Sequence, residues 1–491
     1  MTHGAHIHPV RKATTLSGTN AHANGVELES TSRLPLSNGV HFMGIGGIGM
    51  SGLASILRDR GIAVHGCDLK MNGTQALLQQ RGISVAAGHD PAHLTRDVDL
   101  VVFSAAVSCD EPELRAARAR GIKTISRGEL LADVASSAKL VAVAGAHGKT
   151  TTSGMAAQLL MQAGWDPTVV VGGHMLSLGS NARSGLGRYL VAETDESDGS
   201  FLLLHPSIAI VTNIDREHLN HYQSFDKLIA AFQQFTSQIA PDGTLILCQD
   251  DPVAREVLTH HHLIRYGFGP GAEVTAKSIV SRGLGSEFTA VYRGQRLGVF
   301  QLRVPGRHNV LNALGVISLG MALELPLGVV REALQAFQGT RRRFQVAQLP
   351  DDIWFVDDYA HHPSEIRATL AADPAAGRHR VVVFQPHRFS RTQMLEQEFV
   401  NCFDQADGVI VTDIYAAFEE PIPGISGERL AGLMKAKGQP CVRYVPRRDL
   451  ARYLTAFIQP RDTVFFLGAG DIGQLCYDVA NRLRTTRGTS R

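Results

Sequence analysis

Short runs of consecutive apolar, often β-branched residues alternate along the chain with longer segments of helical periodicity. Continuous apolar runs suit strands that are buried on both faces, as in parallel sheets covered by helices. Regular alternation of such strands with helices predicts an α/β fold. A chain of 491 residues exceeds what one hydrophobic core usually holds, and three domains are therefore expected.

The strand-like runs fall into three groups, which separate near residues 137 and 338. The first group contains "VHFM" and "DVDLVVFSAAV", the second "KLVAVAGA", "YLVAET" and "SIAIVTNI", and the third "IWFVDDY", "RVVVFQPH" and "DTVFFLGAG". The pattern predicts domains at 37–137, 138–338 and 339–491. Residues 1–36 are polar and rich in Gly, Ser, Thr and His, and we expect a disordered extension.

Composition and charge narrow the function classes. Hydrophobic residues make up 44% and the net charge is +2 with both signs mixed, so neither a nucleic-acid partner nor a membrane surface is indicated. No apolar run approaches the length of a spanning helix, and the polar start lacks the apolar stretch of a signal peptide. The six cysteines form no C-x-x-C pair, so we expect no disulfide framework and no cysteine zinc site, and a reducing cytoplasmic location fits.

A glycine-rich loop follows the first strand-like run. Gly44, Gly46 and Gly49 satisfy G-x-G-x-x-G, and Asp68 stands about where a ribose-binding acid belongs. Alone, this indicates a dinucleotide dehydrogenase. The motif by itself does not specify a dinucleotide, because backbone N–H groups at a helix start bind any diphosphate, including that of a UDP-sugar. A second copy at residues 468–473 has no room for a following acid, and we interpret it as close strand–helix packing.

The sequence "VAVAGAHGKTTT" resembles a phosphate-binding loop that has lost one glycine. The pattern G-x-x-x-x-G-K-[ST] would place its first glycine at Val143, and Gly145 comes two residues late. The strand before the loop and the helix after it are both present, and the N–H groups still face an anion. The expected nucleotide-binding residues are Gly145, Ala146, His147, Gly148, Lys149, Thr150 and Thr151, with Lys149 on the phosphates.

Acidic residues follow the neighbouring strands. Glu193 ends "YLVAE", and the next strand leads to His218. Since the carboxyl ends of parallel strands share one edge of a sheet, Thr150, Glu193 and His218 are expected to converge on Mg²⁺. Histidine is an unusual magnesium ligand, and the chemistry alone leaves His218 open.

Six motifs, "GAHGKTTT", "AETDESDGSF", "TNIDREHLNHY", "PGRHNVLNALG", "DDYAHHPSE" and "QPHRFSRT", together resemble the ATP-dependent Mur ligases of peptidoglycan synthesis. The resemblance covers nearly the whole chain after residue 37. It implies a Rossmann-like N-terminal domain for a UDP-sugar, a central P-loop ATPase domain with a parallel-rich sheet, and a Rossmann-like α/β C-terminal domain for an amino acid.

The resemblance also implies roles for single residues. Gly46, Gly47, Ile48 and Asp68 would bind the UDP-sugar, with Ser104, Arg127 and Glu129 as further candidates. Thr150, Glu193 and His218 would hold Mg²⁺, and ATP would also meet His308, Asn309, Arg343 (or Arg342) and Asp357. Tyr359, His361, Arg388 and Arg391 would line the amino-acid and acyl-phosphate region. Ligases that act later in the same pathway carry a modified lysine at about the position of Gln233. The residues that hold a second Mg²⁺ here are therefore open.

The implied reaction joins L-alanine to the lactyl carboxylate of UDP-N-acetylmuramate, with ATP and Mg²⁺, through an acyl phosphate. The catalytic residues would be Lys149, His361 as the base, and Arg388 and Arg391, whose guanidinium groups would bind an anion. We expect a cytoplasmic monomer or homodimer with no nucleic-acid or membrane partner. Three alternatives stay open: a recycling ligase that adds a tripeptide to the same sugar, an NAD-dependent dehydrogenase with a regulatory ATPase domain, and a P-loop switch protein.

Overall fold

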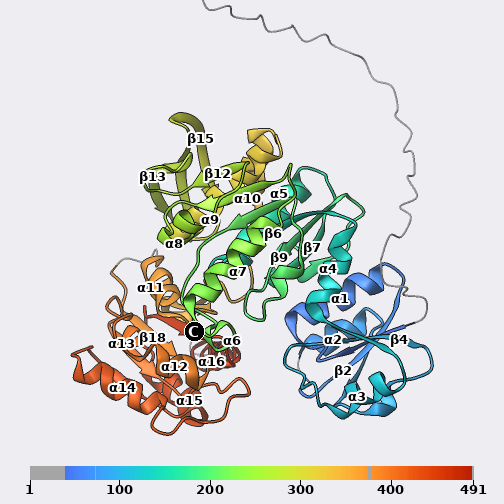
Figure 1. Ribbon diagram of the computed structural model, residues 1–491. Helices are drawn as coiled ribbons and strands as arrows, with labels where there is room; N and C mark the ends of the chain where they lie inside the picture. The colour runs from blue at the N-terminus through green and yellow to red at the C-terminus, as the bar shows by residue number, and fades with distance from the viewer. Residues whose placement is uncertain (1–38, 72, 374–376, 489–491) are drawn as a thin grey trace, which may run out of the picture.

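The computed structural model describes residues 39–71, 73–373 and 377–488 (Figure 1). The predicted disordered extension at residues 1–36 lies outside this range. Three β-sheets are present, built from residues 39–126, 139–302 and 345–467. Helices cover both faces of each sheet, which confirms the predicted three-domain α/β architecture. The exact domain boundaries stay predictions.

The N-terminal sheet has five parallel strands in the order β3-β2-β1-β4-β5. Its strand order reverses between β1 and β4, so the loops after these strands diverge and leave a crevice where open α/β sheets bind ligands. The elements are β1 (Gly39–Met43), α1 (Ile48–Asp59), β2 (Ala63–Asp68), α2 (Gly73–Gln80), β3 (Ser84–Ala87), the 3₁₀ helix η1 (Pro91–His93), β4 (Val98–Phe103), α3 (Pro112–Ala119), β5 (Lys123–Ser126) and α4 (Arg127–Ser136).

The central sheet has ten strands in the order β15-β14-β13-β12-β11-β10-β6-β9-β7-β8. Its strands are β6 (Lys139–Ala144), β7 (Thr168–Met175), β8 (Ser180–Arg183), β9 (Tyr189–Glu193), β10 (Ile208–Val211), β11 (Thr244–Cys248), β12 (Leu263–Tyr266), β13 (Val274–Arg282), β14 (Gly285–Tyr292) and β15 (Gln295–Leu302). Its helices are α5 (Lys149–Gln162), η2 (Ser200–Leu203), α6 (Leu219–Tyr222), α7 (Phe225–Ser237), α8 (Pro252–Val257), α9 (Arg307–Ala322) and α10 (Leu327–Ala336).

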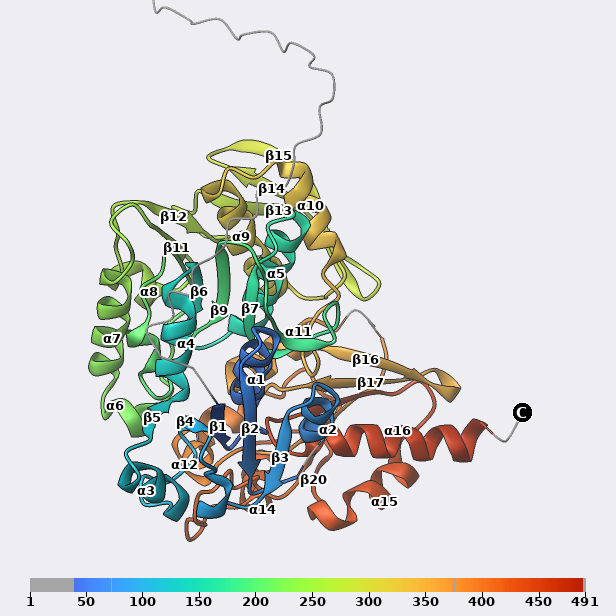
Figure 2. The ribbon, with the colours of Figure 1, turned by 90° about the vertical axis from the view of Figure 1, so that its right-hand side faces the viewer.

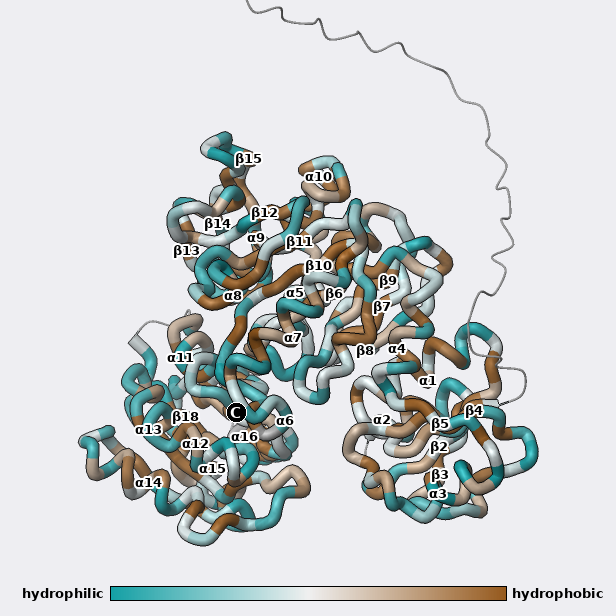
Figure 3. Tube along the Cα trace, viewed as in Figure 1, coloured by the Kyte–Doolittle hydropathy of each residue, from teal (hydrophilic) through white to brown (hydrophobic). Residues whose placement is uncertain are grey.

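Strand β6 lies in the middle of the parallel part of this sheet, between β9 and β10. All five residues from Leu140 to Ala144 are buried, as expected for a strand covered on both sides. Figure 3 shows hydrophobic residues gathered along these strands. The loop after β6 therefore emerges between the ends of β9 and β10, where Glu193 and Asn213 stand.

The C-terminal sheet has the order β16-β17-β21-β18-β19-β20, in which only the edge strand β16 is antiparallel. Its elements are β16 (Gln345–Leu349), η3 (Pro350–Asp352), β17 (Ile353–Asp358), α11 (Pro363–Ala371), β18 (Arg380–Phe384), α12 (Phe389–Met394), α13 (Glu396–Val400), β19 (Gly408–Val411), α14 (Gly427–Ala436), β20 (Val442–Tyr444), α15 (Arg447–Phe457), β21 (Thr463–Leu467) and α16 (Ile472–Gly488).

The second glycine motif lies at the end of β21 in this domain. A Cβ on Gly470 would stand 2.4 Å from Gln385 Oε1 and 2.6 Å from the Tyr415 ring. A Cβ on Gly473 would stand 2.6 Å from Arg342 Nε. Side chains of the domain itself fill this space, in agreement with the packing interpretation.

The first two domains share a hydrophobic core. One continuous cluster of buried side chains runs from α1 and α4 of the first domain to α7 of the second. A hydrogen bond from Asn181 Nδ2 on β8 to the carbonyl oxygen of Ile48 adds a polar link of 2.6 Å. Figure 2 shows α1 and α4 lying against the central domain. Among the residues that the structure describes, no helix is long and apolar enough to span a bilayer.

Candidate active site between the domains

The phosphate loop is held in shape by the residues that end β10. Thr212 Oγ1 donates to the His147 carbonyl oxygen at 2.7 Å, and the His147 N–H donates to Asn213 Oδ1 at 2.8 Å. Gly145 has φ +132°, and a Cβ there would stand 2.1 Å from Thr212 Oγ1. Gly148 has φ +81° and precedes α5. The positive φ angles at both positions favour glycine. Val143, which stands where the usual pattern has its first glycine, is part of strand β6.

Lys149 is the first residue of α5, and its ammonium is held inside the loop. Nζ donates to the carbonyl oxygens of Gly145 and Ala146 and to Glu196 Oε1, the last at 2.7 Å. Burial of the amine is outweighed by the Glu196 carboxylate, so the pKa of Lys149 is raised and the group stays charged. A phosphate that enters the loop must compete with Glu196 for this ammonium.

Thr150 and Glu193 come together as the sequence predicts. Thr150 Oγ1 donates to Glu193 Oε1 at 2.9 Å, and the Gly172 N–H donates to Glu193 Oε2 at 2.5 Å. Burial raises the pKa of Glu193, although the nearby Lys149 opposes this rise. A partly buried carboxylate next to a threonine hydroxyl at a phosphate loop is a donor set that suits Mg²⁺.

His218 lies in an adjoining cluster. Its Nε2 is 3.5 Å from Glu196 Oε1 and 3.7 Å from Glu217 Oε2. One buried oxygen on each of these carboxylates, Glu196 Oε2 and Glu217 Oε1, has no hydrogen-bond partner. Two unsatisfied buried carboxylate oxygens beside an imidazole fit a divalent cation. The sequence did not single out Glu217, because no motif marks a residue two positions beyond Asp215.

Gln233, which stands where later ligases of the family carry a modified lysine, lies elsewhere. Its side-chain amide on α7 donates to the Val257 carbonyl oxygen. The carboxylates around His218 are instead those of Glu196 and Glu217. These two residues are the candidates for a second cation.

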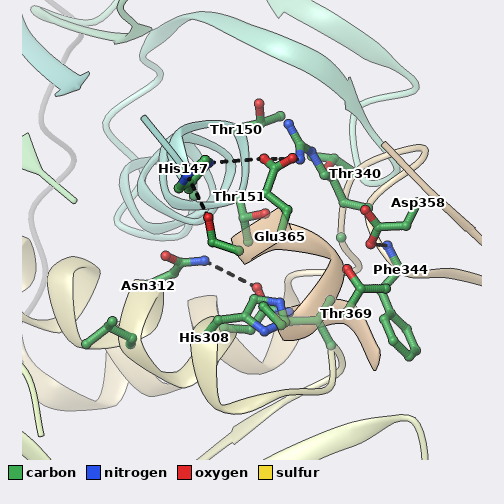
Figure 4. Close-up of a pocket in the computed structure, with 18 of the residues that line it drawn as sticks. His147, Thr150, Thr151, His308, Asn312, Thr340, Phe344, Asp358, Glu365 and Thr369 are labelled. Carbon is green, nitrogen blue, oxygen red and sulfur yellow. Dashed lines mark hydrogen bonds and ion pairs between the residues drawn. The ribbon is translucent and has the colours of Figure 1, made fainter. Parts of the chain in front are cut away.

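A cavity of about 250 Å³ opens beside the phosphate loop, between the central and C-terminal domains (Figure 4). His308 and Asn309 from α9 line one side, and Arg343 and Glu365 from the third domain line the other. Burial and the nearby Arg343 lower the pKa of His308 to about 4, so its ring is neutral at pH 7. A largely apolar cavity next to a phosphate loop suits the adenosine part of a nucleotide.

Of the two neighbouring aspartates of β17, Asp358 lines the cavity and Asp357 does not. Neighbouring residues of a strand point to opposite faces, and the side chain of Asp357 turns to the other side of β17. There Arg342 Nε is 3.5 Å from Asp357 Oδ1, and Arg342 also donates to the carbonyl oxygens of Gly468 and Gly470. Asp357 and Arg342 therefore pair away from the cavity, and Arg343 is the arginine that lines it. The expected contact of Asp357 with the ribose stays a prediction.

His147 forms a partly buried ion-pair network across the domain boundary. Its Nε2 is 2.9 Å from Asp215 Oδ2, and its Nδ1 is 3.4 Å from Glu365 Oε1 of the C-terminal domain. Burial disfavours the charged ring, but the two carboxylates outweigh it and raise the pKa of His147 to about 10. A protonated His147 therefore links the phosphate loop to α11.

This pairing predicts a pH dependence of stability. The pKa of His147 is higher in the folded protein than its unfolded value near 6.5, so protonation of this ring stabilises the fold. The stabilisation is complete below about pH 6.5 and is lost as the pH rises through about 10. From pH 7 to 10, the free energy of unfolding should fall by about 2–4 kcal/mol more in the wild type than in His147→Gln. Urea denaturation measures this, with the exposed His262→Gln as control. Identical losses in wild type and His147→Gln would contradict the network.

The third domain brings its predicted residues to the same place. His361 Nδ1 is 2.9 Å from the Tyr359 carbonyl oxygen, and the His361 and His387 rings are 5.7 Å apart. Arg391 Nη1 is 3.1 Å from His387 Nδ1, and its Nη2 is 3.9 Å from Glu217 Oε1 in the central domain. Arg388 precedes α12, and its buried Nε has no hydrogen-bond partner. The structure thus brings all four predicted residues, Tyr359, His361, Arg388 and Arg391, into one neighbourhood. The sequence analysis did not single out His387, which lies among them.

The N-terminal candidates lie in the crevice between β1 and β4. The Gly46 N–H donates to Asp68 Oδ2 at 2.8 Å, and a Cβ on Gly44 would stand 3.1 Å from Ser104 Cβ. Gly47 and Ile48 are exposed at the start of α1. The glycine loop, Asp68 and Ser104 therefore share one open edge, as a diphosphate site requires.

Arg127 and Glu129 are engaged in structural contacts. Arg127 Nη2 is 2.9 Å from Asp195 Oδ2 of the central domain, so this residue joins the N-terminal domain to the acidic loop after β9. Glu129 completes a capping box with Ser126 at the start of α4. The capping box gives Glu129 a structural role at the start of α4. The expected sugar contacts of Arg127 and Glu129 stay predictions.

Fold and site together define an ATP-using enzyme of three α/β domains, in which the central and C-terminal domains both line the cavity beside the phosphate loop. The chain matches three family models: "Mur ligase family, catalytic domain" over residues 39–139, "Mur ligase middle domain" over 143–320 and "Mur ligase, glutamate ligase domain" over 342–470. It therefore belongs to the Mur ligase family.

Individual relatives narrow the comparison. The chain is 47% identical to UDP-N-acetylmuramate–L-alanine ligase of Sorangium cellulosum over 90% of this chain and 96% of the relative. The crystal structure of UDP-N-acetylmuramate–alanine ligase from Thermotoga maritima superposes with a TM-score of 0.80 at 30% identity, covering 92% of this chain and all of that one. A murein peptide ligase from Psychrobacter arcticus, 23% identical over 93% of this chain and all of that one, gives a TM-score of 0.68 and shares the fold.

Proposed function

We propose that this protein joins L-alanine to the lactyl carboxylate of UDP-N-acetylmuramate at the expense of ATP. The products are UDP-N-acetylmuramoyl-L-alanine, ADP and phosphate. The observation that carries the proposal is the meeting of Lys149, the Glu193 and Glu217 carboxylates and Arg391 at the boundary of two domains. The identity of 47% to an enzyme named for this reaction supports the choice of substrates.

The chemistry follows from the low reactivity of a carboxylate toward an amine. Attack of the lactyl oxygen on the γ-phosphorus of ATP forms an acyl phosphate and releases ADP. Lys149, freed from Glu196 when the phosphates enter, stabilises the charge on the transferring group. The residues that would hold Mg²⁺ are Thr150, Glu193, Glu196, Glu217 and His218. When bound, Mg²⁺ supplies positive charge that neutralises the phosphate oxygens.

The second step is attack of the alanine amine on the acyl carbon, which expels phosphate. Arg391 and Arg388 are placed to bind the negative charge of the alanine carboxylate or of the acyl phosphate. The unpartnered Nε of Arg388 leaves a donor available for such an anion. The buried position of these groups between domains limits access of water to the acyl phosphate.

His361 suits a positioning role better than the role of general base. Burial, together with the nearby Arg391, lowers the pKa of His361 to about 4, although Glu365 opposes this shift. A neutral ring whose Nδ1 faces the Tyr359 carbonyl oxygen presents Nε2 as an acceptor, but its basicity is low.

We therefore expect His361→Gln to lower kcat by about 10-fold, less than the 10²–10⁴-fold typical of a lost general base. The pH–rate profile between about pH 6 and 9 should keep its shape, because a group with a pKa near 4 does not titrate there. Disappearance of a limb from this profile would instead restore His361 as the base.

We further propose a cytoplasmic enzyme that acts without a nucleic-acid or membrane partner. The ordinary net charge of +2 and the buried or isolated cysteines support this location. A monomer or a homodimer stays the expected oligomeric state.

Phosphate release from ATP tests the function and its acceptor together. The purified protein is given UDP-N-acetylmuramate with L-alanine, with the tripeptide, or with no acceptor. Release that needs both the sugar and L-alanine is the expected result. Release with the tripeptide alone would move the assignment to the recycling ligase. Release without sugar would favour a P-loop switch, and NADH binding would favour the dehydrogenase.

A further inference from the structure

A buried cluster of metal-binding side chains lies in the N-terminal domain, apart from the ATP site. His41 on β1, Cys67 on β2, His93 on η1 and Glu113 on α3 offer one ligand atom each, and these atoms all lie within 4.8 Å of one another. His41, Cys67 and Glu113 have no exposed surface. The strand register explains the meeting, because His41 and Cys67 point to the face of the sheet that α3 covers.

The distances within the cluster are close to those between the ligands of one ion. His41 Nε2 is 2.8 Å from Glu113 Oε1, and His93 Nδ1 is 3.2 Å from the same oxygen. Cys67 Sγ is 3.2 Å from Glu113 Oε2 and 3.5 Å from His41 Nε2. Tetrahedral Zn²⁺, with bonds of 2.0–2.3 Å, places its ligand atoms about 3.3–3.7 Å apart. Small outward movements of these side chains therefore admit the ion.

The surroundings of the cluster also match those of a metal site. The other ring nitrogen of His41, Nδ1, lies 2.8 Å from His65 Nδ1, and this contact with a second imidazole orients the ring so that Nε2 faces the cluster. The Asp90 N–H donates to Glu113 Oε2 at 3.2 Å and orients the carboxylate. His89 Nδ1 lies 3.0 Å from Cys67 Sγ, so a further imidazole lies within reach of the cluster.

We propose that His41, Cys67, His93 and Glu113 form a structural binding site for Zn²⁺ or a similar borderline-soft divalent metal. The mixed N, S and O donor set suits zinc and not magnesium. One thiolate and one carboxylate neutralise both charges of the ion, which a buried site requires. The thiol proton leaves to solvent when the metal binds. The sequence analysis predicted no cysteine zinc site, because its spacing rules look for paired cysteines and this cluster contains a single cysteine.

The site would support the UDP-sugar crevice from behind. The carbonyl oxygen of Cys67 accepts the N–H groups of Gly44 and Ile45 at 2.9 and 3.1 Å, so the cluster and the glycine loop share one residue. The next residue, Asp68, holds the Gly46 N–H. A metal on Cys67 would therefore rigidify the loop that is expected to bind the diphosphate. This consequence rests on the proposed function, whereas the metal site itself does not.

Titration of the metal-free full-length protein with Co²⁺, in excess Mg²⁺ and a phosphine reductant, tests the site. We expect one equivalent to produce a thiolate-to-cobalt charge-transfer band, which Zn²⁺ then abolishes. Cys67→Ser should lose the band, and Cys109→Ser, an exposed thiol of the same domain, should keep it. The band needs a thiolate, so cobalt at the ATP site or at His260–His262 does not produce it.

Two further measurements distinguish loss of a metal ligand from a folding defect in Cys67→Ser. His93 is the most exposed ligand, with 21% of its side chain accessible, and His93→Gln should fold and bind Co²⁺ about 10-fold more weakly or worse. One equivalent of Zn²⁺ should raise the Tm of the wild type and not that of Glu113→Gln. Absence of the band in the wild type, its survival in Cys67→Ser, or an equal Tm shift in Glu113→Gln would each overturn the metal site. None of these results depends on ligase activity.

Discussion

Lys149→Met should lower the rate of sugar- and alanine-dependent phosphate release by about 10³-fold or more, equivalent to about 4 kcal/mol of transition-state stabilisation. The methionine keeps most of the side-chain volume and removes the ammonium that Glu196 holds at 2.7 Å in the free protein. That ammonium has a raised pKa and is charged at every working pH. Because the charge acts on the transferring phosphoryl group, kcat should fall more than the affinity for ATP.

A matched control separates this effect from a general loss of charge. Lys227 lies on α7 of the same domain, where its Nζ is bonded only to Gln223 among the contacts of the described residues, and Lys227→Met should keep wild-type activity. Steady-state kinetics of both variants make the comparison. Activity of Lys149→Met within about 10-fold of the wild type would mean that the loop does not stabilise a phosphoryl transition state.

Glu193→Gln should reduce kcat by about 10²–10³-fold and raise the Mg²⁺ concentration needed for half-maximal activity. The amide keeps the shape of the side chain and can still accept the hydrogen bond from Thr150 Oγ1. It removes the negative charge that a hard cation requires of its ligand. The altered Mg²⁺ dependence distinguishes loss of a metal ligand from loss of packing.

The control for this variant is Glu287→Gln on β14, a partly exposed carboxylate of the same sheet that pairs with Arg282. It should change neither kcat nor the Mg²⁺ dependence. Rates are measured over a range of free Mg²⁺ at saturating substrates. An unchanged Mg²⁺ requirement in Glu193→Gln would contradict the assignment of Glu193 to the metal.

The sequence predicted the parts of the site that depend on local chemistry. Lys149 and Thr150 follow from the loop pattern, because a strand, a tight turn and a helix start place them regardless of the rest of the fold. Glu193 follows from its position at the end of a buried strand. The three-domain α/β architecture follows from the alternation of apolar runs with helical segments, and the structure confirms it.

The features that the sequence missed depend on orientation and on contacts between distant segments. Adjacent aspartates at 357 and 358 look alike in a sequence, and only the pleat of β17 decides which one faces the nucleotide cavity. Glu217 becomes a site residue because Arg391 of another domain approaches it. The His41 cluster joins four separate elements, which no spacing rule detects.

Isotope transfer tests the central claim, ATP-dependent activation of the lactyl carboxylate, most directly. UDP-N-acetylmuramate labelled with ¹⁸O in both carboxylate oxygens is converted with ATP and L-alanine, and the released phosphate is analysed by mass spectrometry. Formation of an acyl phosphate predicts that each phosphate carries one ¹⁸O, because the bond from the acyl carbon to the bridging oxygen breaks when the amine attacks. Phosphate without ¹⁸O would show that ATP is hydrolysed by water and that the carboxylate is never phosphorylated.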